Sequence, residues 1–417
     1  MDDADPIVWI ALITVLFWLL TLVRLGIPAE PYFDEVHYLP AARDFLAMGI
    51  FSNREHPLLG KELLAAAIWL FGDNPWGWRI LPTFMGALTL FAAMRTMWHG
   101  SRSAFATIAF GLLLVSGFHL FVHARIAMLD IFFASFLTVA GWQFSAAVRR
   151  PERGRHHLIG TGLAIGLALA SKWNAIPFAP LPGLAFFAYR LRAGRRRLVL
   201  STRGAPVPGV SLLEAALWLG VLPLLIYALT FAPGFFFAQQ PMSGLIEHHM
   251  LMLDLQTQVL QEHPYQSTWP QWLMNSRSIW FIYEPVEGVQ RGIVLLGNPL
   301  TMLLGLPALL WCAWRAVRHR CPAAIGIVTL YVAGVGFWII AAKPVQFYYH
   351  YFFPSIALLA ALTLALDDIW RSGRKALAIV PILASLALFA YFFPILSAAP
   401  LEDASAFTKW MWLDSWI

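Results

Sequence analysis

A short segment after the first apolar stretch concentrates residue types that move protons or bind anions. It reads Pro31-Tyr-Phe-Asp-Glu-Val-His37, and Glu55-His-Pro-Leu-Leu-Gly-Lys61 follows closely. Only 12% of the residues are charged, so an acidic pair, two histidines and a lysine beside apolar segments indicate a function. Either Asp34 or Glu35 could act as a general base for a hydroxyl group. The alternative is that Asp34 only caps the helix that follows it.

His56 and Lys61 belong to a turn that Pro57 and Gly60 shape. Lys61 would offer a cation to a phosphate or a carboxylate. The alternative is a helix start with a lysine that reaches the membrane surface.

Four cations, Arg24, Arg79, Arg125 and Lys172, lie at the ends of four different apolar segments. A single such residue is normally an interfacial anchor, but four around an acidic loop suggest a shared anionic ligand with a phosphate. Asp130 lies in the same region and could orient an arginine or a polar ligand group. Its alternative role is a structural ion pair with Arg79 or Arg125.

We predict no metal ion and no other cofactor. His119 and His123 have the spacing of a helical metal pair, but no nearby carboxylate or cysteine completes a set of three ligands. The common nucleotide-binding and hydrolase motifs are also missing from the sequence. A donor held in the membrane therefore fits better than a soluble nucleotide.

The elements that carry these residues are membrane spans. The 417 residues are 59% hydrophobic with a mean hydropathy of +0.65, and apolar stretches of about 17–25 residues recur, as bilayer-spanning helices require. The chain is therefore predicted to be an all-α, multi-pass membrane protein, whose first span is a retained anchor. We predict eleven spans, over 7–27, 77–98, 103–119, 127–148, 158–173, 174–191, 211–231, 291–314, 322–341, 347–366 and 376–397.

The basic residues predict the orientation of these spans. Of 29 Lys and Arg residues, 18 lie in every second connection, which is the positive-inside pattern of cytoplasmic loops. The net charge of +6 therefore reflects topology rather than nucleic-acid binding. The basic connections contain Arg95, Arg102, Arg149, Arg150, Arg153, Arg155, Arg190, Arg192, Arg195, Arg196, Arg197, Arg203, Arg315, Arg318, Arg320, Arg371, Arg374 and Lys375.

With these loops inside, the N-terminus is cytoplasmic, and the candidate site and the C-terminus are external. Residues 34–48 and 244–260 are amphipathic, which predicts interfacial helices in the first and fourth external loops. We expect one membrane module over 1–417. Its parts are a catalytic half at 1–231 with the first external loop at 28–76, an external loop at 232–290, further spans at 291–397 and an external tail at 398–417.

An ordered set of motifs between about residues 20 and 365 resembles the protein O-mannosyltransferase family. The stretch Ala124-Arg-Ile-Ala-Met-Leu-Asp130 resembles the bacterial branch. The other motifs are Phe33-Asp-Glu-Val-His37, Glu55-His-Pro-Leu-Leu-Gly-Lys61, Gly77-Trp-Arg79, Ser171-Lys-Trp173, His263-Pro-Tyr-Gln-Ser267, Trp269-Pro270 and Gly297-Asn-Pro299.

The resemblance implies a GT-C fold and an inverting transfer of mannose. The donor would be a polyprenyl (dolichyl-type) phosphate, the acceptor a Ser or Thr of an exported protein, and the site the external face of the cytoplasmic (inner) membrane. It also implies Asp34 as the base, with Glu35 as the alternative. The implied phosphate-binding residues are Arg24, Arg79 and Lys172, to which we add Arg125, with His56, Lys61 and Asp130 in support.

Two departures from the family pattern concern acceptor choice and loop shape. The usual His-Pro-Pro-Leu-Gly-Lys is His56-Pro-Leu-Leu-Gly-Lys61 here, and the soluble domain of eukaryotic members is absent from the sequence. One alternative is therefore transfer to a lipid or a cell-envelope glycan. A secondary transporter is disfavoured, because the polar residues gather at one surface and no halves repeat. Expected partners are membrane lipids, and a dimer or export machinery.

Overall fold

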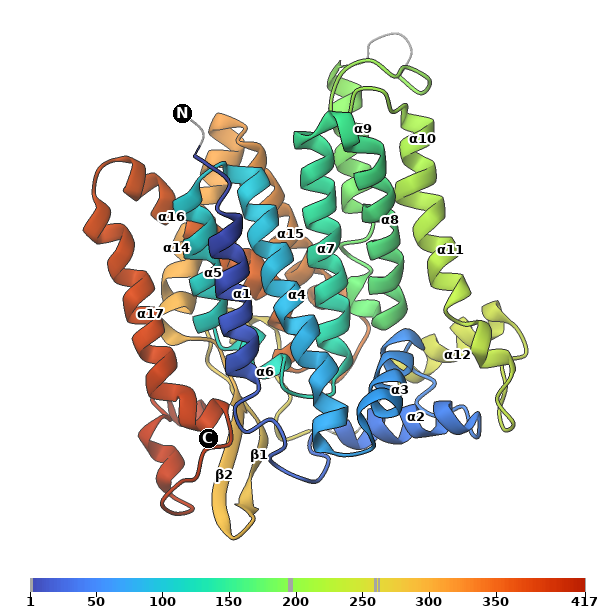
Figure 1. Cartoon of the computed structure of the whole chain (residues 1–417), viewed down its shortest axis with the longest axis vertical. Helices are drawn as coiled ribbons and strands as arrows, with labels where there is room; N and C mark the ends of the chain where they lie inside the picture. The colour runs from blue at the N-terminus through green and yellow to red at the C-terminus, as the bar shows by residue number, and fades with distance from the viewer. Residues whose placement is uncertain (1–2, 194–197, 259–260, 262, 417) are drawn as a thin grey trace.

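The computed structural model of the chain is a bundle of long helices with smaller elements gathered at one end (Figure 1). It describes residues 3–193, 198–258, 261 and 263–416. Within this part, seven helical segments are long and apolar enough to cross a membrane. They are α4 (Pro75–Ser101), α7 (Leu129–Arg149), the segment Leu212–Phe235 with α10 (Leu212–Ala216) and α11 (Leu222–Leu229), α14 (Pro299–His319), α15 (Pro322–Ile340), the segment Tyr348–Arg371 with α16 (Phe352–Arg371), and α17 (Lys375–Leu396).

Four further helices account for the other predicted spans. They are α1 (Ile7–Thr21), α5 (Ala104–Ser116), α8 (Gly154–Ser171) and α9 (Leu181–Ala193). Every predicted span therefore contains a helix, and the long apolar segments confirm a multi-pass membrane protein. That all eleven cross the membrane stays a prediction.

Polar side chains fix several helix starts. Asn74 accepts hydrogen bonds from the main-chain N–H groups of Trp76 and Gly77, at 3.1 and 3.0 Å, and so caps α4. Ser103 caps α5 in the same way, and Asn298 caps α14. Each cap lies where a loop meets an apolar run. The span starts predicted from hydropathy are therefore close to the observed helix starts.

A β-hairpin is the main departure from an all-helical chain. Strand β1 (Ile279–Val286) pairs antiparallel with β2 (Val289–Leu295) across Glu287 and Gly288. Both turn residues have positive φ, 53° and 76°, as a two-residue hairpin turn requires. The predicted start of the eighth span at 291 is wrong, because the apolar residues before Leu295 form a strand and the helix begins at Pro299.

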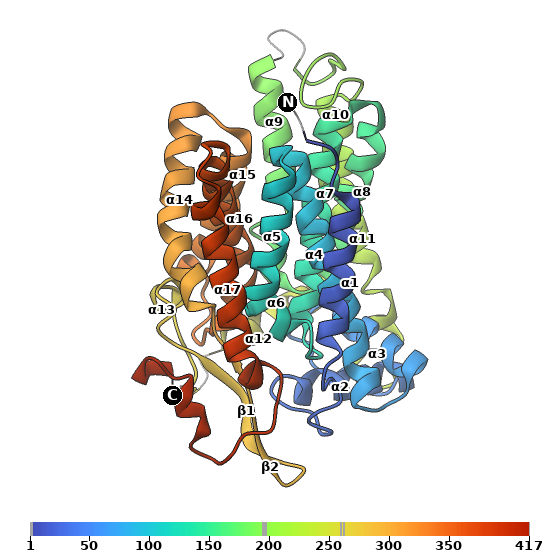
Figure 2. The same ribbon diagram turned by 60° about the vertical axis from the view of Figure 1, so that its left-hand side comes forward.

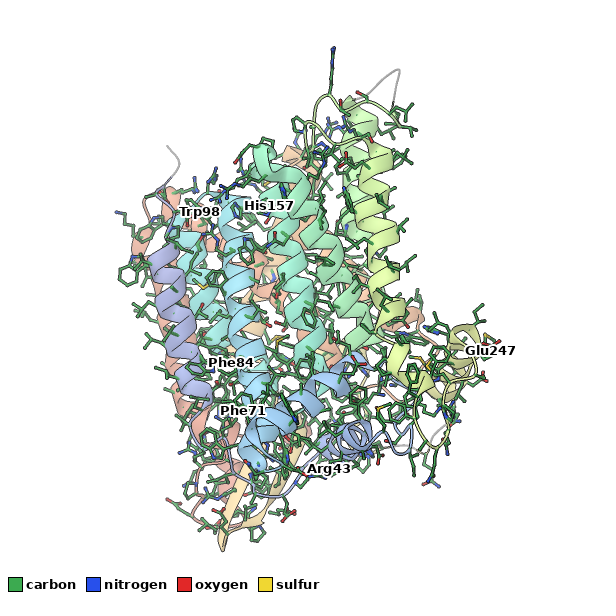
Figure 3. All side chains as sticks on the ribbon, turned by 45° about the vertical axis from the view of Figure 1, so that its right-hand side comes forward. Arg43, Phe71, Phe84, Trp98, His157 and Glu247 are labelled. Carbon is green, nitrogen blue, oxygen red and sulfur yellow. The ribbon has the colours of Figure 1, made fainter. Side chains whose placement is uncertain are left out.

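The end of the bundle opposite the N-terminus carries the smaller elements (Figures 1 and 2). It carries α2 (Glu35–Ala47), α3 (Leu59–Phe71), α6 (His119–His123), α12 (Leu245–Thr257), α13 (Trp269–Leu273), the hairpin and the C-terminus. In Figure 3, His157 and Trp98 mark the N-terminal end, and Arg43 and Glu247 mark the other end. The predicted interfacial helices correspond to α2 and α12, and α3 begins at Leu59, within the motif where the alternative interpretation expected a helix start. Residues 259–260 and three predicted cytoplasmic arginines, Arg195, Arg196 and Arg197, lie outside the described part.

The core lies around α4, α7 and α16, and the outer helices face the surroundings with apolar side chains. In the most apolar part of Tyr348–Arg371, 78% of the residues are buried, whereas in that of Leu212–Phe235 only 17% are buried. Leu224 and Leu225 on α11 are exposed, as expected for side chains that contact lipid. The stable central helices hold the loops that carry the candidate residues.

Candidate active site

The loop between α1 and α2 presents Asp34 at the start of α2. Its main-chain oxygen accepts hydrogen bonds from the N–H groups of His37 and Tyr38, at 3.0 and 3.2 Å, but its carboxylate makes no capping hydrogen bond. The preceding Phe33 has a φ of 50° and stacks on Phe281 of β1, with 4.1 Å between ring centres. The alternative that the Asp34 side chain only caps the helix is therefore wrong, and its carboxylate is available for chemistry.

The surroundings of Asp34 raise the pKa of its carboxyl group to about 6. Removal from water is the main cause. The negative charge of Asp130 adds to the increase, whereas Lys172, His37 and Lys343 oppose it. A general base works best when its pKa lies near the working pH. Asp34 therefore has the electrostatic setting of a base.

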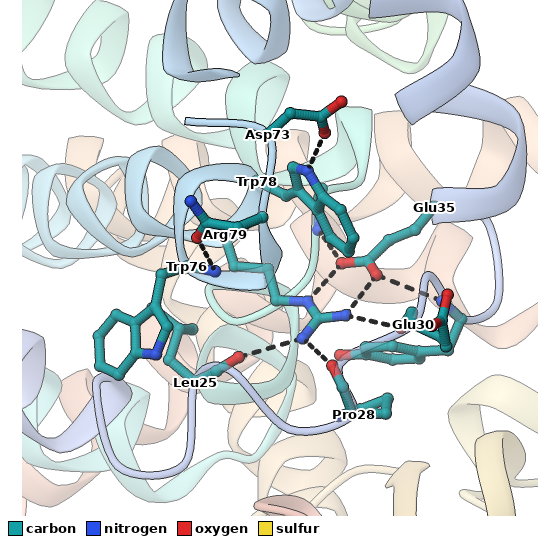
Figure 4. Close-up of polar contacts among 11 residues, drawn as sticks. Leu25, Pro28, Glu30, Glu35, Asp73, Trp76, Trp78 and Arg79 are labelled. Carbon is teal, nitrogen blue, oxygen red and sulfur yellow. Dashed lines mark hydrogen bonds and ion pairs between the residues drawn. The ribbon is translucent and has the colours of Figure 1, made fainter. Parts of the chain in front are cut away.

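Glu35, in contrast, is buried in an ion pair with Arg79 of α4 (Figure 4). Arg79 donates through Nε and Nη2 to the two carboxylate oxygens, at 2.9 and 2.8 Å. The main-chain N–H groups of Tyr32 and Ala127 donate to the same carboxylate, at 3.3 and 2.9 Å. With four donors around it, Glu35 is a structural centre of this loop.

All five N–H groups of the Arg79 guanidinium are in use. Besides its two bonds to Glu35, it donates to the carbonyl oxygens of Leu25 and Pro28, at 3.2 and 2.6 Å, and of Glu30, at 3.1 Å. The predicted contact of Arg79 with a phosphate is therefore not available in this arrangement. Arg79 and Glu35 instead fasten the first loop to α4.

Lys172, directly after α8, forms a buried ion pair with Asp130 in the first turn of α7. The distance from Nζ to Oδ2 is 2.6 Å, and Nζ lies 5.0 Å from the ring centre of Tyr349. Within the described part of the chain, the buried Asp130 Oδ1 has no partner, so it can accept a hydrogen bond from a ligand. The alternative pairing of Asp130 with Arg79 or Arg125 is wrong.

Arg24 and Arg125 hold the end of α1. Arg125 Nη1 donates to the carbonyl oxygens of Thr21 and Val23, at 2.7 and 2.5 Å. Arg24 donates to the main-chain oxygen and the hydroxyl of Ser397, at 2.9 and 2.5 Å. These bonds tie α1 to the elements beside it. Of the four cations predicted to bind phosphate, Lys172 is the one whose charge acts on Asp34 in the described chain.

Lys61 closes the turn that carries His56. Its ammonium is buried and donates to the carbonyl oxygens of Asn53 and His56, at 2.5 and 2.9 Å. Burial lowers the pKa of Lys61 to about 7. Because its ammonium donates to main-chain oxygens, Lys61 stabilises the loop rather than offering its charge to a ligand.

The His56 ring lies beside α2, and the charges of two lysines, Lys172 and Lys343, act on it. It packs edge-on against Tyr38, with 5.8 Å between ring centres. Burial lowers the pKa of His56, and the charges of Lys172 and Lys343 lower it further. His56 is therefore uncharged at neutral pH and lies close to the groups that surround Asp34.

Lys343 and Gln256 belong to no predicted site motif, and the charge of Lys343 acts on Asp34. Lys343 Nζ donates to Gln256 Oε1 at 3.0 Å, and Tyr349 meets the Phe33 ring edge-on at 6.1 Å. The predicted orientation placed Lys343 in an external connection, on the same side as Asp34. This shared side was the sequence signal that could have indicated Lys343 as a candidate site residue.

The described residues contain no group of three or more His, Cys, Asp or Glu side chains that could hold a metal ion. His123 Nδ1 forms a hydrogen bond with the main-chain oxygen of His119, at 2.8 Å, so this pair serves its own helix turn. That the protein needs no metal stays a prediction.

Models of one protein family match both halves of the chain. The model described as dolichyl-phosphate-mannose-protein mannosyltransferase matches residues 11–76 and 71–237. The model described as the C-terminal four TMM region of protein-O-mannosyltransferase matches residues 241–416. Together they cover nearly the whole chain.

Bacterial relatives align over nearly their full length. Polyprenol-phosphate-mannose--protein mannosyltransferase of Corynebacterium glutamicum is 27% identical over 470 residues, which cover 93% of this chain and 88% of the relative. The protein of the same name from Mycolicibacterium smegmatis is 26% identical over 497 residues, with coverage of 100% and 94%. The alignments therefore span nearly all of this chain and most of each relative.

Solved structures share the fold. The Saccharomyces cerevisiae protein O-mannosyltransferase Pmt1-Pmt2 complex bound to the sugar donor matches with a TM-score of 0.83 and 14% identity, over 100% of this chain and 93% of that one. ArnT from Cupriavidus metallidurans bound to undecaprenyl phosphate matches with a TM-score of 0.59 and 18% identity, over 93% and 64%. The chain thus belongs to the protein O-mannosyltransferase family and has the membrane-embedded GT-C fold.

Proposed function

We propose that this chain transfers mannose from a polyprenyl phosphate to a Ser or Thr hydroxyl of an exported protein. Its full-length relatives are named polyprenol-phosphate-mannose--protein mannosyltransferases. The observation that carries the proposal is the place of Asp34, a carboxyl group with a raised pKa, near the Lys172–Asp130 ion pair. A proton acceptor and a cation in one pocket suit the displacement of a phosphate by a hydroxyl.

The proposed reaction is a single displacement at C1 of the sugar. The acceptor oxygen attacks C1 while its proton passes to the Asp34 carboxylate. The bond between C1 and the phosphate oxygen breaks, and the polyprenyl phosphate leaves with the electron pair. Lys172 stabilises the negative charge that develops on this leaving group. Because attack and departure occur on opposite faces of C1, the anomeric centre is inverted.

We assign supporting roles to the other predicted residues. Asp130 positions Lys172 and offers Oδ1 to a sugar hydroxyl. Glu35 and Arg79 hold the main chain beside Asp34 through their buried ion pair, so they act on positioning rather than on the phosphate. The same assignment holds for Lys61, which closes the His56 turn.

We place the pocket on the external face of the cytoplasmic membrane. The long apolar helices support a multi-pass protein. The opposite end of the bundle carries the N-terminus (Figure 1), and the positive-inside pattern of the connections supports a cytoplasmic position for that end. A dimer, or a contact with the export machinery, stays a prediction.

An assay with purified full-length protein tests the proposed acceptor. Polyprenyl-phosphate-mannose would be offered together with a peptide rich in Ser and Thr, and in parallel with membrane lipids and cell-envelope glycan. The proposal expects mannosylated peptide with an inverted anomeric centre. Transfer confined to a lipid or a glycan would replace the protein acceptor by that alternative, and retention at C1 would contradict a single displacement. The secondary-transporter alternative is not supported, because the chain belongs to a transferase family.

A further inference from the structure

Lys343 brings a second ammonium group to the pocket that contains Lys172. It lies after α15, in the connection that leads to Tyr348. Its Nζ donates one hydrogen bond within the described chain, to Gln256 Oε1 at 3.0 Å. Since an ammonium carries three N–H donors, two are left for a ligand.

Gln256 of α12 joins Lys343 to the first external loop. While its side-chain oxygen accepts from Lys343, its Nε2 donates to the main-chain oxygen of Glu55 at 2.8 Å and lies 3.3 Å from His56 Nδ1. The amide therefore needs both its acceptor and its donor to hold this arrangement. A carboxylate or a methyl group at position 256 would lose one or both of these bonds.

The charges in the pocket leave Lys343 unneutralised. Lys172 has a carboxylate partner in Asp130, whereas no ion pair of the described residues includes Lys343. Burial and the positive charge of Lys172 together lower the pKa of Lys343 to about 8, against the opposing effect of Asp34, Asp130 and Glu55. Two ammonium groups near each other, one of them without a carboxylate, favour an anionic ligand.

We propose that Lys343, positioned by Gln256, binds the phosphate of the polyprenyl-phosphate donor together with Lys172. This inference rests on the proposed function and names a further residue that contacts the leaving group. Lys172 is already paired with Asp130, so Lys343 supplies an ammonium group that no carboxylate of the described residues holds in an ion pair. Helix α12 thereby takes part in donor binding.

Binding of sugar-free polyprenyl phosphate to the full-length protein in lipid nanodiscs tests this proposal. Lys343→Gln should weaken binding about tenfold or more, since a charge-assisted hydrogen bond is lost. Lys343→Arg, which keeps the charge, should stay within about threefold of the wild type. Lys409→Gln is the matched control, because Lys409 is an exposed lysine of the external tail, and it should bind normally. Polyprenol without phosphate should bind equally to all four proteins.

Gln256 variants test the positioning role. Gln256→Ala should raise KM for the donor about threefold with little change in kcat, because the ammonium is retained but less ordered. Gln256→Glu should weaken polyprenyl phosphate binding more, because its carboxylate would pair with Lys343. In the double variant Lys343→Gln with Gln256→Ala, the second change should add nothing.

A folded Lys343→Gln protein that binds polyprenyl phosphate as tightly as the wild type would overturn the proposal. If Lys343→Gln does not fold, as judged by its thermal unfolding, Gln256→Glu decides by the same criterion. If the variants show the expected differences in polyprenyl phosphate binding but the wild-type protein transfers no mannose, the result counts against the proposed function and leaves the phosphate site in place.

Discussion

Asp34 and Glu35 are neighbours in sequence but have different surroundings, and this difference divides their roles. Glu35 receives four hydrogen bonds and is paired with a buried arginine. Asp34 has no such partner, and the loss of water around it raises its pKa. The carboxylate of Glu35 is occupied by its four donors, whereas a carboxylate with a raised pKa, such as that of Asp34, accepts a proton more readily. These contacts support Asp34 as the proposed base.

The pH dependence of transfer should report the titration of Asp34. The base acts in its ionised form, so kcat/KM should rise about tenfold per pH unit below a pKa of about 6 and then level. Burial is the main cause of this raised pKa, and the charges of Lys172, Asp130, His37 and Lys343 modify it. Loss of the proton from Lys343, whose pKa is about 8, should lower donor binding at higher pH. The expected profile is therefore bell-shaped.

Initial rates between pH 5 and 9 at low donor concentration check this profile. Asp254→Asn is a suitable control, because Asp254 is an exposed carboxylate on α12, and its profile should match the wild type. A rate that does not change between pH 5 and 7 would be incompatible with Asp34 as the base.

Breaking the Glu35–Arg79 pair should destabilise the protein strongly. Both side chains are fully buried, so Glu35→Gln leaves the arginine charge without its partner, at a cost of about 3–5 kcal/mol in the free energy of unfolding. The control is Arg43→Gln, which breaks an ion pair with Asp73 whose two side chains are 40% and 44% exposed. This change should cost less than about 1 kcal/mol. Thermal unfolding in detergent compares the two variants, and equal melting temperatures would contradict a structural role for the buried pair.

At the scale of elements, the hairpin connects to the catalytic loop through aromatic rings. Phe281 of β1 stacks on Phe33, which directly precedes Asp34. Phe281→Ala should remove this support and lower kcat about tenfold or more, because small displacements of a reacting group are costly. Its control is Gly288→Ala at the hairpin turn, where the added methyl group meets no atom within 4 Å. The control strains the turn without touching the stack.

Transfer rates of the two variants, each checked for folding, decide whether the stack positions Asp34. A folded Phe281→Ala protein with the kcat of the wild type would show that Phe33 holds its position without β1. A similar loss of kcat in both variants would indicate a general effect of hairpin stability.

Hydropathy predicted the helices well because a bilayer span needs a long apolar run, and such runs are visible in the sequence. It did not separate β2 from the span that follows, since the end of β2, Ile293–Leu295, and the start of α14 are both apolar. The pair Glu287-Gly288 between two β-branched runs was the local signal for the hairpin. Helix α3 (Leu59–Phe71) is too short to be predicted as a membrane span, so the sequence indicated only its start, as the alternative interpretation of the Lys61 turn.

At the scale of the whole molecule, the pocket is assembled from distant parts of the chain. Asp34, Lys172 and Lys343 come from three connections that meet at one end of the bundle. The assignment of catalysis to residues 1–231 stays a prediction, and the pocket also includes Lys343 from the C-terminal part. A division of the chain by hydropathy cannot show this convergence.

The candidate site was predictable in part. Motif order gave Asp34 and Lys172 as candidates, and the predicted orientation placed the polar residues on one side. The sequence did not distinguish a cation that faces a ligand from one that is saturated by main-chain oxygens, as Arg79 and Arg125 are. Both kinds occur at the end of an apolar segment, and the difference depends on which backbone folds around them.

The transfer rate of Asp34→Asn is the most direct test of Asp34 as the base. The substitution keeps the shape of the side chain but removes its ability to accept the proton. We expect kcat to fall about 10²–10⁴-fold, while expression, melting temperature and polyprenyl phosphate binding stay close to those of the wild type. A folded Asp34→Asn protein that transfers mannose at nearly the wild-type rate would contradict the assignment.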